Sequence, residues 1–204
     1  KYYDVAVIDE IQMIGNSQRG QAWTRAVLGI QSPEVHVCGA ANSKELLLRI
    51  IEDCNDEVEV INYTRDTPLK IINKVFELKH AERGDALVVF SKKRVLEIAK
   101  LFRERGRRTS VIYGDLPPEV RRMQYDAFLS GESEILVTTD AIGMGVNLPI
   151  KRIIFMDIQK FDGEEVRFLT SQEIKQIAGR AGRKGIYDIG YVGVNTHDQL
   201  FIKE

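Results

Sequence analysis

The chain has 204 residues, a formal net charge of -1 and 44% hydrophobic residues. This length allows one large domain or two small ones with real hydrophobic cores. The near-zero charge argues against a protein that holds nucleic acid through bulk charge, although a local basic track is compatible with it. No apolar run reaches the roughly 18 residues that a membrane helix needs. Cys38 and Cys54 lack CxxC spacing, so we expect free thiols in a reducing compartment.

The first predicted element is a buried strand over residues 3–8, which ends at Asp9-Glu10-Ile11-Gln12. A buried parallel strand needs neighbours on both sides, so we expect this chain to be a piece of a longer protein. Two adjacent acids at the carboxyl end of such a strand lie where open α/β sheets bind ligands. Asp9 can hold a Mg²⁺ and Glu10 can orient or deprotonate a water. The alternative is a strand that only turns polar at its end.

Further along the first unit, the patterns predict a helix over residues 21–30, a strand over 34–38 and a helix over 44–52 that Ser43 caps. Alternation predicts another strand over residues 57–63. The glycines of residues 15–20 do not make a phosphate loop, because Lys and Ser/Thr do not follow them. The polar, proline-bearing residues 64–68 predict a break in the chain. We therefore place one domain at residues 1–63, a linker at 64–69 and a second domain at 70–204.

In the second unit, residues 69–79 fit a strand or a helix equally. Beyond them, the patterns predict strands at residues 85–90, 109–113, 134–138, 152–156 and 190–194. Helices are expected after Ser91, after Pro118 and after the Thr170-x-x-Glu173 capping box, and a glycine-rich loop at residues 139–149. Strands that alternate with helices predict an α/β protein with a mainly parallel sheet.

The stretch Gln176-Ile-Ala-Gly-Arg-Ala-Gly-Arg183 places two glycines inside a predicted helix, although glycine is a poor helix former. Read as a helix, it places Arg180 and Arg183 on one face, while its two glycines cost that helix about 2 kcal/mol relative to alanine. Two guanidiniums beside a bare backbone suit a polyphosphate, because each fork donates several hydrogen bonds to phosphate oxygens. The alternative is a tight helix crossing, with glycines for close approach and arginines in solvent.

Together, the Asp-Glu-Ile-Gln box, the Thr-Thr-Asp-Ala-Ile-Gly-Met-Gly loop and this last stretch resemble motifs II, V and VI of superfamily 2 helicases. Residues 8–13, 19–25, 111–118 and 140–145 narrow the resemblance to the RNA helicases typified by the mitochondrial degradosome subunit and its bacterial relatives. The resemblance implies two RecA-like domains with mainly parallel sheets, the first truncated at its N-terminus. It also implies ATP and Mg²⁺ in the cleft between the domains.

By this resemblance, Asp9 binds Mg²⁺ and Glu10 activates the attacking water, so both are candidate metal and catalytic residues. Gln12 and Gln176 couple the nucleotide to domain closure.

On the second domain, the resemblance implies that Arg180 and Arg183 reach the phosphates. Gly145 and Asn147 match motif V residues near the ribose and the cleft.

Ser91 and Thr139 match positions that hold the nucleic-acid backbone, and hydroxyls at strand ends suit phosphate contact without base readout. For Ser91, a helix cap alone is an equal alternative. The basic runs at residues 91–94 and 103–108 could border an RNA track, but charged, solvated helix ends are the favoured interpretation.

Two departures from the family pattern affect the interpretation. Gly39-Ala-Ala-Asn42 replaces a Gly-x-Pro-Ala form, which puts motif III coupling in doubt and favours a bacterial, cytoplasmic protein, with the mitochondrial matrix as the alternative. The phosphate loop is absent from the sequence, so we expect the fragment alone to be inactive.

The resulting hypothesis is the motor core of an ATP-dependent RNA helicase, monomeric, acting on single-stranded or partly duplex RNA, with an exoribonuclease as a possible partner and no membrane partner. A non-catalytic nucleic-acid-binding module and a DNA translocase are the rival hypotheses.

Overall fold

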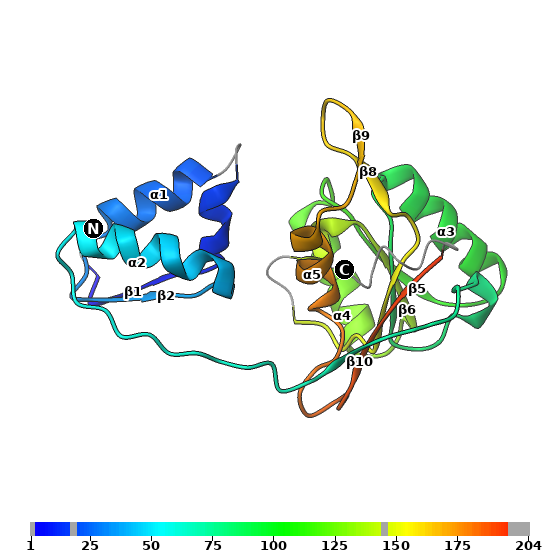
Figure 1. Cartoon of the computed structure of the whole chain (residues 1–204). Coiled ribbons are helices and arrows are strands. Elements are labelled where there is room, and N and C mark those ends of the chain that lie inside the picture. Colours follow the sequence, from blue (N-terminus) through cyan, green and yellow to red (C-terminus); the bar gives the residue numbers. More distant parts are fainter. Residues whose placement is uncertain (1–2, 17–19, 144–146, 196–204) are drawn as a thin grey trace. The chain divides into compact units, whose positions relative to one another are not determined.

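The computed structural model describes residues 3–16, 20–143 and 147–195. The chain divides into two compact units, Lys1–Tyr63 and Thr64–Glu204 (Figure 1). None of the helices in the described part of the chain has the length and apolar character needed to cross a membrane.

Unit 1 contains two parallel strands, β1 (Val5–Ile8) and β2 (Glu34–Val37). Its helices are α1 (Gly20–Gly29) and α2 (Lys44–Asp53), preceded by the short 3-10 helices η1 (Ile11–Gly15) and η2 (Ala41–Ser43). Both α-helices lie over the same side of the strands (Figure 1). Side chains of β1 alternate accordingly, with Ala6 and Ile8 buried and Val5 and Val7 exposed.

Two local predictions in unit 1 are wrong. Residues 57–63 are not a strand, because no strand in the described part of unit 1 pairs with them. Alternation indicates one apolar face but supplies no partner, and Tyr63 is 88% exposed. Ser43 does not cap α2: its side chain donates to the Ala40 carbonyl at 2.7 Å instead.

Unit 2 is built on a six-stranded sheet in the order β3-β10-β7-β4-β6-β5, and every pairing in it is parallel. Its strands are β3 (Leu69–Ile71), β4 (Asp85–Val88), β5 (Thr109–Ile112), β6 (Ile135–Thr138), β7 (Arg152–Phe155) and β10 (Gly190–Val194). The predicted α/β class with a mainly parallel sheet is confirmed. The ambiguous residues 69–79 form β3 and, near their end, the start of the 3-10 helix η3 (Leu78–His80).

Helices cover both faces of this sheet. On one face, α3 (Lys92–Glu104) packs through Val95, Ile98, Ala99 and Phe102 onto Leu87 and its neighbours. On the other face lie α4 (Pro118–Leu129) and α5 (Ser171–Ala178). Because the central strands are buried on both faces, they are continuous apolar runs and not alternating ones.

A buried ion pair lies at the start of β4. Asp85 is fully buried and accepts hydrogen bonds of 2.6 Å from Nε and from Nη2 of Arg152. Burial raises the pKa of the Asp85 carboxyl, and the Arg152 guanidinium opposes that rise. The pair joins the amino ends of β4 and β7, which are neighbours in the sheet.

An antiparallel hairpin of β8 (Gln159–Phe161) and β9 (Val166–Phe168) stands out from unit 2 between β7 and α5 (Figure 1). The sequence patterns did not predict it, because each strand has three residues. Asp162-Gly163 in its loop is the signal that could have found it, since Gly163 has a φ of 113° and Asp-Gly is typical of hairpin loops.

Candidate functional site

The acids of the Asp-Glu-Ile-Gln box lie at the carboxyl end of β1, as predicted. The Asp9 carboxylate accepts a 2.8 Å hydrogen bond from the Glu10 amide, and Glu10 has a left-handed backbone with φ 55° and ψ 43°. For a residue with a Cβ this conformation costs about 1–2 kcal/mol. Such strain is concentrated at functional sites, where the surrounding structure maintains it. Trp23 is half-buried and donates its indole N–H to the Asp9 carbonyl at 2.8 Å.

Gln12 links the acids to the turn after β2. Its Nε2 donates to the Glu10 carboxylate, and its Oε1 accepts from the Ala40 amide at 3.0 Å. A Cβ on Gly39 would lie 2.4 Å from Cγ2 of Ile11, so this approach of the two segments requires glycine. The link uses a backbone N–H, and therefore it does not depend on a proline in the 39–42 turn. The coupling role of Gln12 stays a prediction.

The described residues contain no group of three or more His, Cys, Asp or Glu side chains that could hold a metal ion. Asp9 and Glu10 supply two adjacent carboxylates, which is the donor set that Mg²⁺ uses when waters and substrate phosphates complete its coordination. The residues present therefore fit a Mg²⁺ that arrives with a nucleotide, and fit an isolated metal centre poorly.

The prediction that Arg180 and Arg183 lie on a helix face is wrong. Helix α5 ends at Ala178, and the glycines that follow form a turn, in which Gly182 has a φ of 76°. The Gly182 amide donates to the Ile150 carbonyl at 2.8 Å instead of continuing the helix. A Cβ on Gly182 would lie 2.5 Å from Cγ2 of Thr67 and 2.8 Å from the Gly190 amide nitrogen. The close approach of Thr67 and Gly190 thus explains why residue 182 is a glycine. The predicted alternative, a tight crossing with another helix, does not describe these neighbours.

Both arginines instead reach the glycine-rich loop. Arg180 donates from Nη2 to the Gly143 carbonyl, and Arg183 donates from Nη1 to the Asn147 carbonyl at 3.1 Å. Gln176 packs beside Gly143, where an added Cβ would lie 3.7 Å from its Cδ. A guanidinium has five N–H donors, so contact through one nitrogen is compatible with binding a phosphate oxygen as well.

The structure therefore brings the predicted residues Asn147, Gln176, Arg180 and Arg183 into one cluster within unit 2. Gly145, predicted to belong to the same cluster, lies outside the described residues.

Ser91 and Thr139 follow β4 and β6, which are adjacent parallel strands, so they share one edge of the sheet. Ser91 is exposed and its Oγ accepts from the Arg94 amide at 3.2 Å, which confirms the helix cap. Thr139 is 8% exposed and its Oγ1 accepts from the Ala141 amide at 3.3 Å. A hydroxyl that accepts one hydrogen bond still has a proton to donate, so a contact with a phosphate backbone remains a prediction for both.

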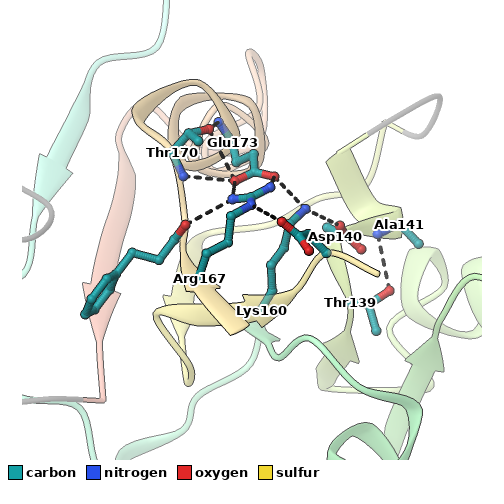
Figure 2. Close-up of polar contacts among 9 residues, drawn as sticks. Thr139, Asp140, Ala141, Lys160, Arg167, Thr170 and Glu173 are labelled. Atoms are coloured by element: carbon teal, nitrogen blue, oxygen red, sulfur yellow. Dashed lines mark hydrogen bonds and ion pairs between the residues drawn. The ribbon is translucent and has the colours of Figure 1, made fainter. Parts of the chain in front are cut away.

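A polar network that the sequence patterns did not predict connects the β8–β9 hairpin to α5 (Figure 2). The Glu173 carboxylate accepts two hydrogen bonds from the Arg167 guanidinium, at 2.9 and 3.0 Å, and forms an ion pair with Lys160 at 2.5 Å. It also completes the predicted capping box with Thr170, which is confirmed. Lys160 reaches Asp140 at 3.4 Å, so the network continues to the glycine-rich loop.

This network fixes the charge of Glu173. Burial by itself would raise the pKa of the carboxyl, but hydrogen bonds from Arg167 and Lys160 hold that pKa at about 2. The capping-box spacing identifies Glu173 and Thr170 in the sequence. The basic partners carry no local signature, because they belong to a hairpin that the patterns did not predict.

Comparison with known proteins gives two family matches. The DEXQ-box helicase domain of Suv3 matches residues 1–63, and the helicase conserved C-terminal domain matches residues 67–185. The Candida albicans protein named ATP-dependent RNA helicase SUV3, mitochondrial, is 44% identical over 184 residues, which are 90% of this chain and 26% of that protein. The Gallus gallus protein named ATP-dependent RNA helicase SUPV3L1, mitochondrial, is 46% identical over 191 residues, 90% of this chain and 24% of that protein. The chain thus spans about a quarter of the length of these relatives.

Among solved structures, Saccharomyces cerevisiae Dbp5 bound to RNA and ADP with beryllium fluoride has a TM-score of 0.67 at 17% identity, over 98% of this chain and 55% of that one. This likeness concerns the fold, and it confirms the prediction of RecA-like α/β domains.

The prediction of a bacterial, cytoplasmic protein is wrong, because the similar proteins of Candida albicans, Oryza sativa, Saccharomyces cerevisiae and Gallus gallus are named as mitochondrial. The 39–42 turn misled the interpretation. Its contact with Gln12 uses backbone atoms, so the side chains of this turn are a poor guide to the source. With motif II at the end of β1 and motifs V and VI joined in unit 2, the chain belongs to the family of the helicase conserved C-terminal domain, and its first 63 residues match the DEXQ-box helicase domain of Suv3.

Proposed function

We propose that this chain is part of the motor of an ATP-dependent RNA helicase, which couples ATP hydrolysis to movement along RNA and to unwinding. The observation that carries the proposal is the contact of both arginines, Arg180 and Arg183, with the glycine-rich loop. Two guanidiniums held against one loop can stabilise the negative charge that spreads over the phosphate oxygens during phosphoryl transfer.

In this proposal, the acids of unit 1 act on the same nucleotide. Asp9 holds the Mg²⁺, which when bound would neutralise charge on the phosphates, and Glu10 orients the attacking water. Gln12 contacts the Glu10 carboxylate and the Ala40 amide, so it is suited to report the state of the acid to the 39–42 turn. Gln176 has the corresponding role in unit 2, beside Gly143. Gly145 and Asn147 are proposed to bind the nucleotide, as the family resemblance implies.

The strand that is moved is proposed to be RNA, single-stranded or partly duplex, held in part by the hydroxyls of Ser91 and Thr139. The names of the relatives support RNA and a mitochondrial location. We also propose that the protein is a monomer and that an exoribonuclease is its partner. We further propose domains at residues 1–63 and 70–204, joined by residues 64–69.

The test replaces Arg183 by Ala in the full-length protein. Loss of this guanidinium should reduce RNA-stimulated ATP hydrolysis by about 10³-fold or more, because such an arginine is worth about 10³–10⁵ in rate. The matched control is Lys184→Ala, which removes the neighbouring cation. Lys184 pairs with Asp66 at 2.7 Å and its side chain is 81% exposed, so its loss should leave turnover near normal.

Unchanged thermal unfolding of both variants shows that the fold is intact. Near-normal turnover of Arg183→Ala would contradict the role of this arginine. Absence of hydrolysis by the unmodified protein would favour a binding module without turnover.

A further inference from the structure

The segment that enters unit 2 is bound to the turn that carries the arginines. The Arg65 guanidinium donates to three backbone carbonyls: Nη1 to Gly179 at 2.6 Å, Nη2 to Ala181, and Nε to Thr67 at 2.5 Å. The next residues continue the contact. Thr67 is 6% exposed, and the Pro68 carbonyl accepts from the Gly190 amide at 2.9 Å.

We propose that Arg65 is a positioning residue for Arg180 and Arg183. This inference rests on the proposed function, because it assigns Arg65 to the same hydrolytic site. It also gives the predicted linker a second task, since a segment that only spans two domains needs no fixed contact with the turn after α5.

Of the carbonyls that Arg65 binds, that of Gly179 belongs to the residue directly after α5, and that of Ala181 lies in the turn beyond it. Gly179 and Ala181 lie on either side of Arg180, so one guanidinium holds the backbone before and after this arginine. The negative end of the α5 dipole also favours a cation at this place.

The turn needs such support because of its composition. Gly179 and Gly182 lie in it, and Gly182 has a left-handed φ of 76°. Glycine loses more conformational freedom on folding than any other residue. Arg183 is attached through Gly182, so a turn that is not held from outside would let the Arg183 guanidinium leave the Asn147 carbonyl.

A lysine cannot replace Arg65 in this role. The guanidinium is a rigid fork that serves separate carbonyls at once, whereas an ammonium is a point charge on a flexible stem. The decisive variant is therefore Arg65→Lys, which keeps the charge and removes the fork. The matched control is Arg83→Lys, since Arg83 donates from Nη2 to the Gly131 carbonyl at 2.6 Å in the turn after α4.

The first measurement is steady-state ATP hydrolysis by the full-length protein with single-stranded RNA. Arg65→Lys should lower kcat by about 10- to 100-fold, since a misplacement of about 1 Å can cost 10²-fold. The KM for ATP should stay within about twofold, because the lost interaction belongs to the transition state. Arg83→Lys should leave both constants unchanged.

The second measurement combines Arg65→Lys with Arg183→Ala. If Arg65 acts through Arg180 and Arg183, Arg65→Lys should slow Arg183→Ala by less than it slows the unmodified protein, because only its effect through Arg180 is left. Losses that multiply would overturn the inference, as would an unchanged kcat of Arg65→Lys.

The third measurement does not depend on turnover. Hydrogen exchange with mass spectrometry on the full-length protein should show faster exchange of residues 179–184 in Arg65→Lys, with β4 and β6 unaffected. Unchanged exchange there would overturn the inference by itself. If the unmodified protein hydrolyses no ATP, the proposed function fails, and the exchange result still decides whether Arg65 orders the turn.

Discussion

Replacement of Glu173 by Gln tests the network that joins the hairpin to α5. Glutamine keeps the capping box, because either Glu or Gln can accept from the amide of the N-cap residue. The change therefore removes the charge from the contacts with Arg167 and Lys160 and leaves the helix start in place.

The magnitude follows from the pKa of Glu173, which is about 2 in the folded protein against an ordinary value of 4.5. At about 1.4 kcal/mol for each pKa unit, the whole difference of about 2.5 units sets an upper limit of about 3.5 kcal/mol. The side chains of Arg167 and Glu173 are 31% and 23% exposed, so water screens the pair. We therefore expect Glu173→Gln to lower the free energy of unfolding by about 1–2 kcal/mol at pH 7.

The sign of the pH dependence is fixed, because the folded pKa lies below the unfolded one. The stabilisation is fully present above about pH 4.5 and is lost as the pH falls toward 2. The difference in unfolding free energy between the unmodified chain and Glu173→Gln should therefore shrink to about half at pH 3.5.

Urea unfolding followed by circular dichroism measures this difference. Fluorescence of Trp23, the sole tryptophan in the sequence, identifies the transition of unit 1, so that the transition of unit 2 can be read separately. Equal differences at pH 7 and pH 3.5 would refute the reasoning, and so would the absence of a difference at pH 7.

Three further predictions concern single positions. Gly182→Ala should destabilise unit 2 by about 2–4 kcal/mol, because a Cβ there would lie 2.5 Å from Cγ2 of Thr67 and the φ of residue 182 is 76°. Gly185 has a φ of 81° but open space around it, so the control Gly185→Ala should lower the free energy of unfolding by about 1 kcal/mol in the same urea experiment. Ser91→Asp keeps an N-cap and should preserve stability, but its charge should weaken RNA binding in a filter assay if the hydroxyl contacts a phosphate; unchanged affinity would leave Ser91 with the cap alone. Arg152→Leu should cost about 3–5 kcal/mol of unfolding free energy, since it leaves the buried Asp85 carboxylate unpaired; a loss below 1 kcal/mol would contradict this account of the pair.

The sheet of unit 2 could be predicted because its strands are continuous apolar runs between turn signals, and such runs form strands wherever a sheet is covered on both faces. Residues 57–63 show the limit of that reasoning. Their alternation is real, but a strand also needs a partner, and the pattern of one segment does not report whether a partner exists.

The candidate site could be predicted to the level of motifs, and its geometry could not. The spacing of Arg180 and Arg183 fits a helix face, but the hydrogen bond of Gly182 to Ile150 and its close approach to Thr67, both distant in the sequence, end the helix earlier. The contacts of Arg65 could not be predicted either, because contacts between residues far apart in the sequence leave no local pattern. Its acceptors lie more than 110 residues away, apart from the Thr67 carbonyl.

The most direct test of the central claim is ATP hydrolysis by the full-length protein, alone, with single-stranded RNA and separately with single-stranded DNA. We predict hydrolysis that RNA stimulates well beyond any effect of DNA. Equal stimulation by DNA would contradict the assignment of RNA as the substrate, and a folded protein that hydrolyses no ATP under any of these conditions would contradict the motor itself.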